Sequence, residues 1–434
     1  MVTTLCICGV TVVAEVLAIL IKPQIRFKKI QIGTYWLIAL IGAIILFSTN
    51  SITIKEFFSA ITANTAVNPL KILVLFISMT LMSVFLDSVG FFKYFATLAI
   101  KKANKSQIKL FLLLYIMVSV LTIFTSNDII ILTFTPFICY FAKEAKINPI
   151  PFLVAEFVSA NTWSMFLIIG NPTNIFLASS QNIPFLKYIG VMALPTLFAG
   201  IASFLMLLLV FRKQLKGNIE YTAEEHLVLP DKPLTIIGVV NLALCLILLI
   251  ISSYIGFEMW YISLGFCVSM FIVATIYKLA RKEKLREIVV CFKQAPWQLI
   301  PFALSMFVLV LALEKCGFTH TIASFLGEKE TILTYGASSF LASNVINNIP
   351  MSVLFSSVLN ELNGINLTKA VYATVIGSNI GAFLTPLGAL AGIMFSSLAN
   401  SHGIKFTFLT FVKYGVLIAI PTLFAALAGL YCIL

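Results

Sequence analysis

PLKILVLFISMTLMSVFLDSVGF, residues Pro69 to Phe91, has a second version in PWQLIPFALSMFVLVLALEKCGF, residues Pro296 to Phe318. Aligned without a gap, the two stretches share the leading Pro, a Ser-Met pair, an acid and the final Gly-Phe. Two shorter matches follow in the same order along the chain. Ser126-Asn127 matches Ser343-Asn344, and the segment 161–170 matches 379–388. The chain therefore consists of two related halves.

The composition places both halves in a membrane. Hydrophobic residues make up 60% of the 434 residues and charged residues 11%, and the mean hydropathy is +1.04. A soluble domain of this size would need a more polar surface. Apolar runs near the spanning length of about 20 residues recur from end to end. The first run lacks a basic n-region and a cleavage site, so we expect a retained helix rather than a signal peptide.

The apolar runs predict an all-α polytopic membrane protein with ten full spans and two hairpins. The spans are expected near residues 2–22, 31–49, 69–88, 148–182, 188–212, 234–254, 259–278, 297–316, 366–399 and 407–432. The first repeat is predicted to cover 1–212 with a hairpin at 108–143, and the second 234–434 with a hairpin at 331–360. The polar stretch 213–233 is predicted to be a cytoplasmic linker between them.

The net charge of +12 reflects membrane topology rather than a nucleic-acid partner. With the N-terminus outside, all but six of the 29 Lys and Arg fall on the cytoplasmic side of a plasma membrane. The six are Lys55, Lys71, Lys187, Lys315, Lys329 and Lys369. This asymmetry follows the positive-inside rule. The span at Pro69 then runs inward and the span at Pro296 outward, so the repeats are inverted, as is typical of secondary transporters with a site between repeats.

The first hairpin is predicted to be re-entrant, because lysines place both of its ends on the cytoplasmic side. Its tip is Thr125-Ser126-Asn127-Asp128. Non-helical backbone at membrane depth is stable only where it lines a cavity or is packed in protein. An Asp near mid-membrane costs about 2.5–3.5 kcal/mol, which makes Asp128 a functional candidate. The alternative is that Asp128 caps the second arm.

The second hairpin has a neutral tip, Ser343-Asn344, followed by Asn347-Asn348. Val345 stands where the first hairpin has its Asp. Asn side chains offer donors and acceptors without a fixed charge. So many asparagines within an apolar run favour a binding site over simple helix breaking.

Each hairpin is followed by a span that Gly and Pro interrupt. The first holds Asn161 and Gly170-Asn171-Pro172-Thr173-Asn174, and the second Ser378-Asn379 and Thr385-Pro386-Leu387-Gly388. Pro removes a helix hydrogen bond and Gly lets the chain unwind, so that freed backbone groups can bind ions or polar solutes. The predicted substrate or ion site consists of Ser126, Asn127, Asp128, Asn161, Gly170, Asn171, Thr173, Asn174, Ser343, Asn344, Asn347, Asn348, Ser378, Asn379, Thr385 and Gly388.

Other acids lie within or beside the apolar runs. Glu156 either relays protons together with Asp128 or lies near the cytoplasmic interface, whereas Asp87 and Glu314 are expected to be interfacial anchors. The eight cysteines form no CxxC pair and the three histidines are far apart, which predicts no disulfide, metal site or cofactor. No GxxxxGK[ST] loop occurs, so this chain is not expected to hydrolyse ATP or to be an enzyme.

At these motifs the chain resembles the arsenical pump membrane proteins, or arsenite efflux pumps. They belong to the ion transporter superfamily, together with Na+/H+ antiporters and citrate and dicarboxylate carriers. The resemblance extends from about residue 69 to residue 400. The matching residues are Asn127-Asp128, Leu132, Thr135-Pro136, Gly170 to Asn174, Asn347 to Met351, Gly377-Ser378-Asn379 and Thr385 to Gly388.

The resemblance implies a scaffold beside a moving transport unit, and export of arsenite or antimonite in exchange for protons. It also implies a homodimer and, in some members, a separate ATPase subunit. The alternatives are a Na+/H+ antiporter or a cation-coupled citrate or dicarboxylate carrier. Sodium-coupled carboxylate carriers have Ser-Asn-Thr at both hairpin tips, where this chain has Asp128 and Val345 as the third residues. A membrane enzyme would need paired metal ligands, and a passive channel would not need inverted repeats with two hairpins.

Overall fold

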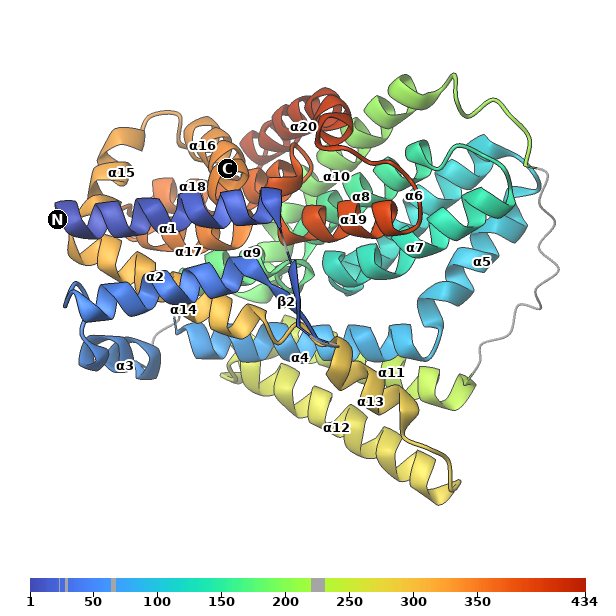
Figure 1. The fold of residues 1–434 in the computed structure, drawn as a ribbon, viewed down its shortest axis with the longest axis horizontal. Coiled ribbons are helices and arrows are strands. Elements are labelled where there is room, and N and C mark those ends of the chain that lie inside the picture. Colours follow the sequence, from blue (N-terminus) through green and yellow to red (C-terminus); the bar gives the residue numbers. More distant parts are fainter. Residues whose placement is uncertain (23, 28–29, 64–67, 220–230) are drawn as a thin grey trace.

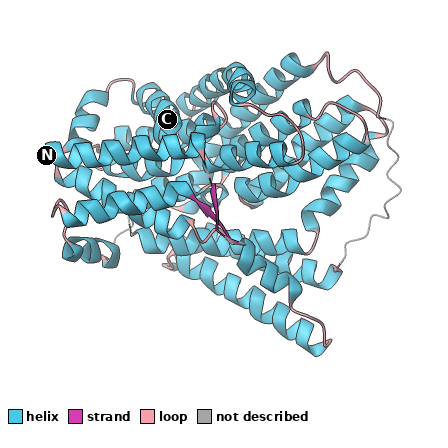
Figure 2. Ribbon diagram, in the orientation of Figure 1, coloured by secondary structure: helices cyan, strands magenta, loops and turns pink. Residues whose placement is uncertain are grey.

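The computed structural model describes residues 1–22, 24–27, 30–63, 68–219 and 231–434. Helices make up almost the whole described chain, as Figure 2 shows, which confirms the all-α prediction. One antiparallel ribbon was not predicted, formed by β1 (Gln24–Phe27) and β2 (Ile30–Gly33). Residues 220–230 of the predicted linker lie outside the described part of the chain.

The helices of the two halves correspond one to one in order. The first half holds α1 (Val2–Ile21), α2 (Thr34–Ser48), α3 (Ile54–Thr62), α4 (Pro69–Ser88), α5 (Phe91–Ala103), α6 (Gln107–Phe124), α7 (Asn127–Glu144), α8 (Ile150–Trp163), α9 (Pro172–Ser180) and α10 (Phe185–Phe211). The second half holds α11 (Lys232–Ile255), α12 (Met259–Ala280), α13 (Arg286–Gln294), α14 (Leu299–Lys315), α15 (Phe318–Leu326), α16 (Thr331–Ile346), α17 (Asn348–Leu359), α18 (Gly364–Gly381), α19 (Leu390–Ser401) and α20 (Phe408–Tyr431). In the residues that the structure describes, both halves therefore hold ten α-helices, the number that a twofold repeat would give.

Both hairpins form as predicted. The pair α6 and α7 lies in the right-hand half of Figure 1, and α16 and α17 lie in the left-hand half, where the N-terminus is. Each pair turns within two residues or fewer, because α6 ends at Phe124 before Asn127, and α16 ends at Ile346 before Asn348. The hairpins therefore enter the bundle from opposite ends, as inverted repeats require.

Both predicted interrupted spans are broken. Between α8 and α9 the chain forms two short 3-10 turns, η1 (Ser164–Phe166) and η2 (Ile168–Gly170). Between α18 and α19 it forms a single turn, η3 (Pro386–Gly388). Pro172 begins α9 after the first break, and Pro386 begins η3 inside the second; at these first positions a missing N–H removes no hydrogen bond.

In the described residues, eight helices are long and apolar enough to cross a membrane. The predicted span 31–49 is wrong at its start, because residues 30–33 belong to β2 and α2 is only 15 residues long. The Gly33 N–H at the end of the ribbon donates to Gln298 Oε1 at 2.8 Å. This bond ties the start of α2 to the start of α14.

Four short helices in the described residues were not predicted from the sequence. They precede or follow the long helices α4 and α14, and they are α3, α5, α13 and α15. The first of them begins with a capping box, in which Thr53 and Glu56 bond each other's backbone. Lys315 Nζ, at the end of α14, lies 2.8 Å from Glu56 Oε1. The hydrogen bond from Lys315 and those from Thr53 lower the pKa of Glu56 to about 2.

Side-chain contacts join loops that are far apart in the sequence. Asn148 Nδ2 donates to Gln214 Oε1 at 2.8 Å, so these two loops lie on one face of the bundle. Gln181 Nε2 donates to Asn360 Oδ1 at 2.8 Å, so these two loops also share a face. The backbone of Ser106 also pairs with that of Asn218 in the linker.

The helices pack in two groups. The first group, named here the scaffold helices, contains α1, α2, α4, α11, α12 and α14, which pack against one another. The second group, named here the site helices, contains α6 to α10 and α16 to α20. Figure 1 shows α4, α11 and α12 along the lower side, with the site helices above them. Because the hairpins and broken helices all belong to the second group, the predicted site falls within it.

Candidate functional site

The tip of the first hairpin is bonded to the first broken helix. Asn127 Nδ2, at the start of α7, donates to Asn161 Oδ1 on α8 at 3.0 Å. Asn161 Nδ2 in turn donates to the Phe157 carbonyl one turn earlier, at 2.8 Å. Both asparagines are buried. Packing α7 against α8 therefore brings together two residues that the sequence separates by a whole helical arm.

Asn379 joins the two repeats. Its Oδ1 accepts from Ser164 Oγ and from Asn171 Nδ2, both at 3.0 Å. Its Nδ2 donates to Asn174 Oδ1 at 2.7 Å and to the carbonyl of Val375 at 2.8 Å. The side chain is fully buried, so all four of its bonds are shielded from solvent. Side chains of both broken segments thus form one hydrogen-bond network.

The second hairpin is bonded to the second break in the same manner as the first. Asn344 Oδ1 accepts from the backbone N–H and the hydroxyl of Thr385, at 3.1 and 2.7 Å. Asn344 Nδ2 donates to the carbonyl of Gly381 at 3.0 Å, and Asn347 Nδ2 donates to that of Leu387 at 3.0 Å. Asn347 has φ of 68° and ψ of 152°, a positive-φ conformation, outside the left-handed helical region, that residues other than Gly rarely adopt.

The remaining predicted residues are buried but bond locally. Thr173 donates through its backbone and its hydroxyl to Asn171 Oδ1, which caps α9. Ser343 donates to the carbonyl of Phe340 at 2.9 Å, and Asn348 is the first residue of α17. These residues therefore shape the broken segments and the hairpin turn.

Gly170 and Gly388 stand at equivalent places where the chain touches the end of the preceding helix. A Cβ atom at Gly170 would lie 2.2 Å from the carbonyl oxygen of Ser164, and one at Gly388 would lie 2.4 Å from that of Gly381. Such contacts with backbone atoms cannot be relieved by a side-chain rotation. The two glycines are therefore needed for the breaks to fold as tightly as they do.

We expect Gly170→Ala and Gly388→Ala each to lower the thermal stability of the purified protein, because forcing extra volume into a packed site costs about 1–3 kcal/mol. The measurement is the apparent unfolding temperature in detergent. Gly190→Ala and Gly265→Ala are matched controls, since nothing lies within 4 Å of a Cβ there. Equal shifts in all four variants would contradict the argument.

Several buried oxygens in this region have no hydrogen-bond partner among the described residues. They are Ser126 Oγ, Asn127 Oδ1, Thr162 Oγ1 and Ser378 Oγ. Buried polar atoms nearly always have a partner, so orphaned ones require an explanation, such as a ligand. All four stand at or beside the residues that bond the hairpins and broken helices together. This unused bonding capacity is a further reason to place the site there.

Asp128 lies in the first turn of α7 and is half-buried. The N-cap of this helix is Ser126, so the alternative that Asp128 is the cap residue is wrong. A carboxylate in the first turn faces the positive end of the helix dipole. Asp128 is therefore next to Asn127, a member of the buried network, without serving as a cap.

Glu156 is buried among the helices. Only 1% of its side chain is exposed, and both of its carboxylate oxygens accept from Thr135 Oγ1 of α7, at 3.0 and 3.1 Å. It stands between one and two turns from Asn161 on the same helix. Through its bonds with Thr135, Glu156 is connected to α7, the hairpin arm that carries Asp128.

Two residues that matter here were missed from the sequence. Ser164 follows Asn161 in the broken helix and bonds across the repeats, but a lone Ser in an apolar run gives little signal. Glu15 is 3% exposed in α1, and its Oε1 has no partner among the described residues. An acid inside a predicted span is a signal in itself, and it should have identified Glu15.

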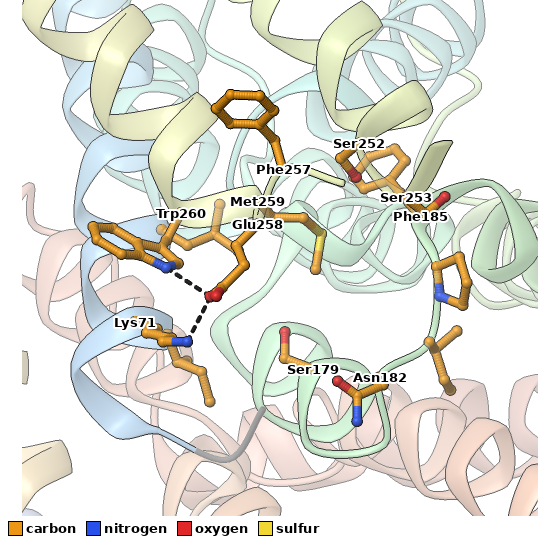
Figure 3. A pocket seen from close by; sticks show the side chains of 14 residues that line it. Lys71, Ser179, Asn182, Phe185, Ser252, Ser253, Phe257, Glu258, Met259 and Trp260 are labelled. Carbon is orange, nitrogen blue, oxygen red and sulfur yellow. Dashed lines mark hydrogen bonds and ion pairs between the residues drawn. The ribbon is translucent and has the colours of Figure 1, made fainter. Parts of the chain in front are cut away.

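A cavity of about 330 Å³ lies away from these residues, between the start of α4, the α9–α10 turn and the α11–α12 turn (Figure 3). Lys71 Nζ lies 2.7 Å from Glu258 Oε2, and Trp260 Nε1 donates to the same oxygen at 2.8 Å. Lys71 lowers the pKa of Glu258. Because the cavity is lined by scaffold and site helices, its shape depends on how the two groups are positioned.

A bundle of inverted repeats, with re-entrant hairpins and broken helices joined by buried polar side chains, defines a membrane transporter. The chain belongs to the citrate transporter family, whose model matches residues 16–363. This result agrees with the superfamily inferred from the motifs.

Three individual proteins are similar to this chain over most of its length. The Arsenical pump membrane protein of Escherichia coli is 25% identical over 366 residues, which cover 82% of this chain and 84% of the relative. The 46 kDa membrane protein of Mycobacterium leprae is 26% identical over 381 residues, covering 83% and 85%. The crystal structure of the YdaH transporter of Alcanivorax borkumensis has a TM-score of 0.50 at 12% identity and covers 99% of this chain and 97% of that one. The last similarity concerns the fold alone.

Proposed function

We propose that this transporter exports arsenite or antimonite in exchange for protons, across a plasma membrane with the N-terminus outside. The observation that carries the proposal is the buried, uncharged set of amide and hydroxyl groups at the hairpin tips and breaks, with Asp128 and Glu156 beside it. The name of the E. coli relative supports the substrate. In this proposal Asp128 and Glu156 take up and release the exchanged proton.

The chemistry of the substrate fits the unused bonding capacity. Arsenous acid is a neutral trihydroxide, with three O–H donors and oxygens that accept. The orphaned oxygens of Ser126, Asn127, Thr162 and Ser378 are acceptors, and the three hydroxyls among them can also donate. A neutral solute would need no fixed countercharge. The carboxylates of Asp128 and Glu156 then couple its movement to a proton.

The family description favours a second candidate, a cation-coupled citrate or dicarboxylate carrier. Such a substrate carries two or three negative charges, which a buried site must balance. Among the described residues, the Lys or Arg counted as buried is Lys278, and it is paired with Asp231, Glu283 and Glu287. That cluster is at the end of α12 and is remote from the hairpin tips in sequence. Bound sodium ions would then have to supply the positive charge.

Flux in everted membrane vesicles separates these candidates. With an acidic interior, vesicles containing the protein should accumulate arsenite, and collapse of the pH gradient should release it. Sodium-stimulated uptake of citrate or succinate without arsenite transport would instead establish the second candidate. Arsenite flux that equilibrates but never accumulates would indicate a channel. The same assay on purified protein in liposomes tests whether the proposed separate ATPase subunit is needed, and sizing in detergent tests the proposed homodimer.

A further inference from the structure

Two acids at matching positions of the repeats accept hydrogen bonds from the hairpin arms. Asp87 lies near the end of α4, and its Oδ1 accepts from Thr133 Oγ1 of α7 at 2.7 Å. Glu314 lies near the end of α14, and its Oε2 accepts from Ser357 Oγ of α17 at 3.4 Å. Each acid is therefore bonded to the second arm of its own hairpin. The two contacts join scaffold helices to site helices.

The two contacts are related by the inverted repeat. Asp87 and Glu314 coincide when the two sequence stretches are aligned without a gap. The helices that carry them, α4 and α14, pack against equivalent arms, α7 and α17. Because the repeats are inverted, the ends of α4 and α14 lie at opposite ends of the bundle. One contact is consequently close to each predicted side of the membrane.

The two contacts differ in length and in exposure to solvent. A hydroxyl at 2.7 Å from a carboxylate makes a strong, charge-assisted bond. At 3.4 Å the same pair is beyond the usual range for O–H···O bonds. Asp87 is also half-buried, whereas Glu314 is exposed, so solvent weakens the longer contact further. In this conformation the first contact is closed and the second is stretched.

We propose that Asp87–Thr133 and Glu314–Ser357 are alternating latches, of which one is closed in each end state of transport. Inverted repeats reach their second end state by exchanging the conformations of the two halves. The second state would therefore have a short Glu314–Ser357 contact and a stretched Asp87–Thr133 contact. The proposal rests on alternating-access transport, but not on the identity of the substrate. Asp87 and Glu314 act as positioning residues and touch no substrate.

The position of the site helices relative to the scaffold can be measured without substrate. Spin labels at Ser253→Cys on α11 and Lys187→Cys on α10 report the distance between the two groups near the cavity of Figure 3. Both residues are exposed. The exposed native thiols, Cys6 and Cys432, are replaced by Ser so that they take no label. Pulsed electron spin resonance then gives the populations of the two end states in liposomes.

The latch model predicts shifts of opposite sign. Thr133→Val should decrease the population of the present conformation relative to the other at least about tenfold, since it removes a bond to a charged group. Ser357→Ala should shift the same ratio the other way. In the double variant the two effects should largely cancel. Thr133→Ser and Ser357→Thr, which keep the hydroxyls, should remain near the wild-type ratio.

The controls distinguish this proposal from the proposed function. Single variants must match the wild type in apparent unfolding temperature and in elution on size exclusion, which shows that they are folded. Shifts in the same direction for both single variants, or no shift in either, would overturn the latches. Those results would leave arsenite flux by the unlabelled wild type unaffected. Absence of any such flux, with opposite population shifts, would reject the substrate and keep the latches.

Discussion

Asp128→Asn is expected to abolish arsenite accumulation in everted vesicles, with a loss of at least about 100-fold, the scale for removing a group that transfers protons. The change keeps the shape of the side chain, replaces one acceptor oxygen with an NH2 donor and removes the proton exchange. Because α7 begins at Asn127 and Asp128 makes no capping bond, the helix should still form. The measurement is the initial rate of pH-driven uptake, together with growth of an arsenite-sensitive host.

A surface carboxylate provides the matched control. Glu361 is exposed beyond the end of α17, so Glu361→Gln removes an acid without affecting the buried network. Its flux should equal that of the wild type. Asp128→Asn should also retain exchange of arsenite for arsenite, which moves no net proton. Undiminished pH-driven uptake by Asp128→Asn would remove this residue from the coupling and leave Glu156 as the candidate.

Asn379→Ala is expected to reduce both stability and flux severely. The side chain is fully buried and bonds Ser164, Asn171 and Asn174 of the other repeat. Each buried group left without a partner costs about 1–3 kcal/mol. The readouts are the apparent unfolding temperature and arsenite uptake per correctly folded molecule.

Asn366 offers the corresponding control, because its Nδ2 bonds Glu328 at 2.7 Å on the surface. Asn366→Ala should change neither readout by much. Asn379→Asp is informative as well, since a carboxylate could still accept from Ser164 and Asn171 but would have to be protonated to donate to Asn174. If Asn379→Ala transported normally, the bridge between the repeats would not be part of the transport machinery.

Much of the fold could be predicted because the sequence contains two related halves. A weak signal in one half, such as the polar tip at Ser126-Asn127, became convincing when Ser343-Asn344 appeared in the other. The lysines at the ends of segment 106–144 predict that both ends face the same side of the membrane, which favours a re-entrant hairpin. Breaks were predictable at Pro172 and Pro386, since Pro and Gly act through local backbone geometry.

The sequence did not reveal which residues far apart along the chain form hydrogen bonds with each other. Asn161 and Asn379 match in the repeat, yet Asn161 bonds its own hairpin and Asn379 bonds the other half. No local pattern distinguishes these two outcomes, because they depend on how whole helices pack. The ribbon of residues 24–27 and 30–33 was missed for a similar reason. Ile30 and Ile32 lead directly into the apolar run of α2, and the start of that helix at Thr34 depends on the pairing of the two strands and on the bond from Gly33 to Gln298.

The bond from Asn379 to the first broken segment has a consequence for how this family can diversify. A substitution at Ser164, Asn171 or Asn174 changes the surroundings of a residue encoded some 200 positions later, as the sequence separations of 215, 208 and 205 show. We therefore expect a change at one of these three positions to need a compensating change near Asn379. We expect chimaeras that join the first half of one relative to the second half of another to lose folding or transport more often than single substitutions in either parent do.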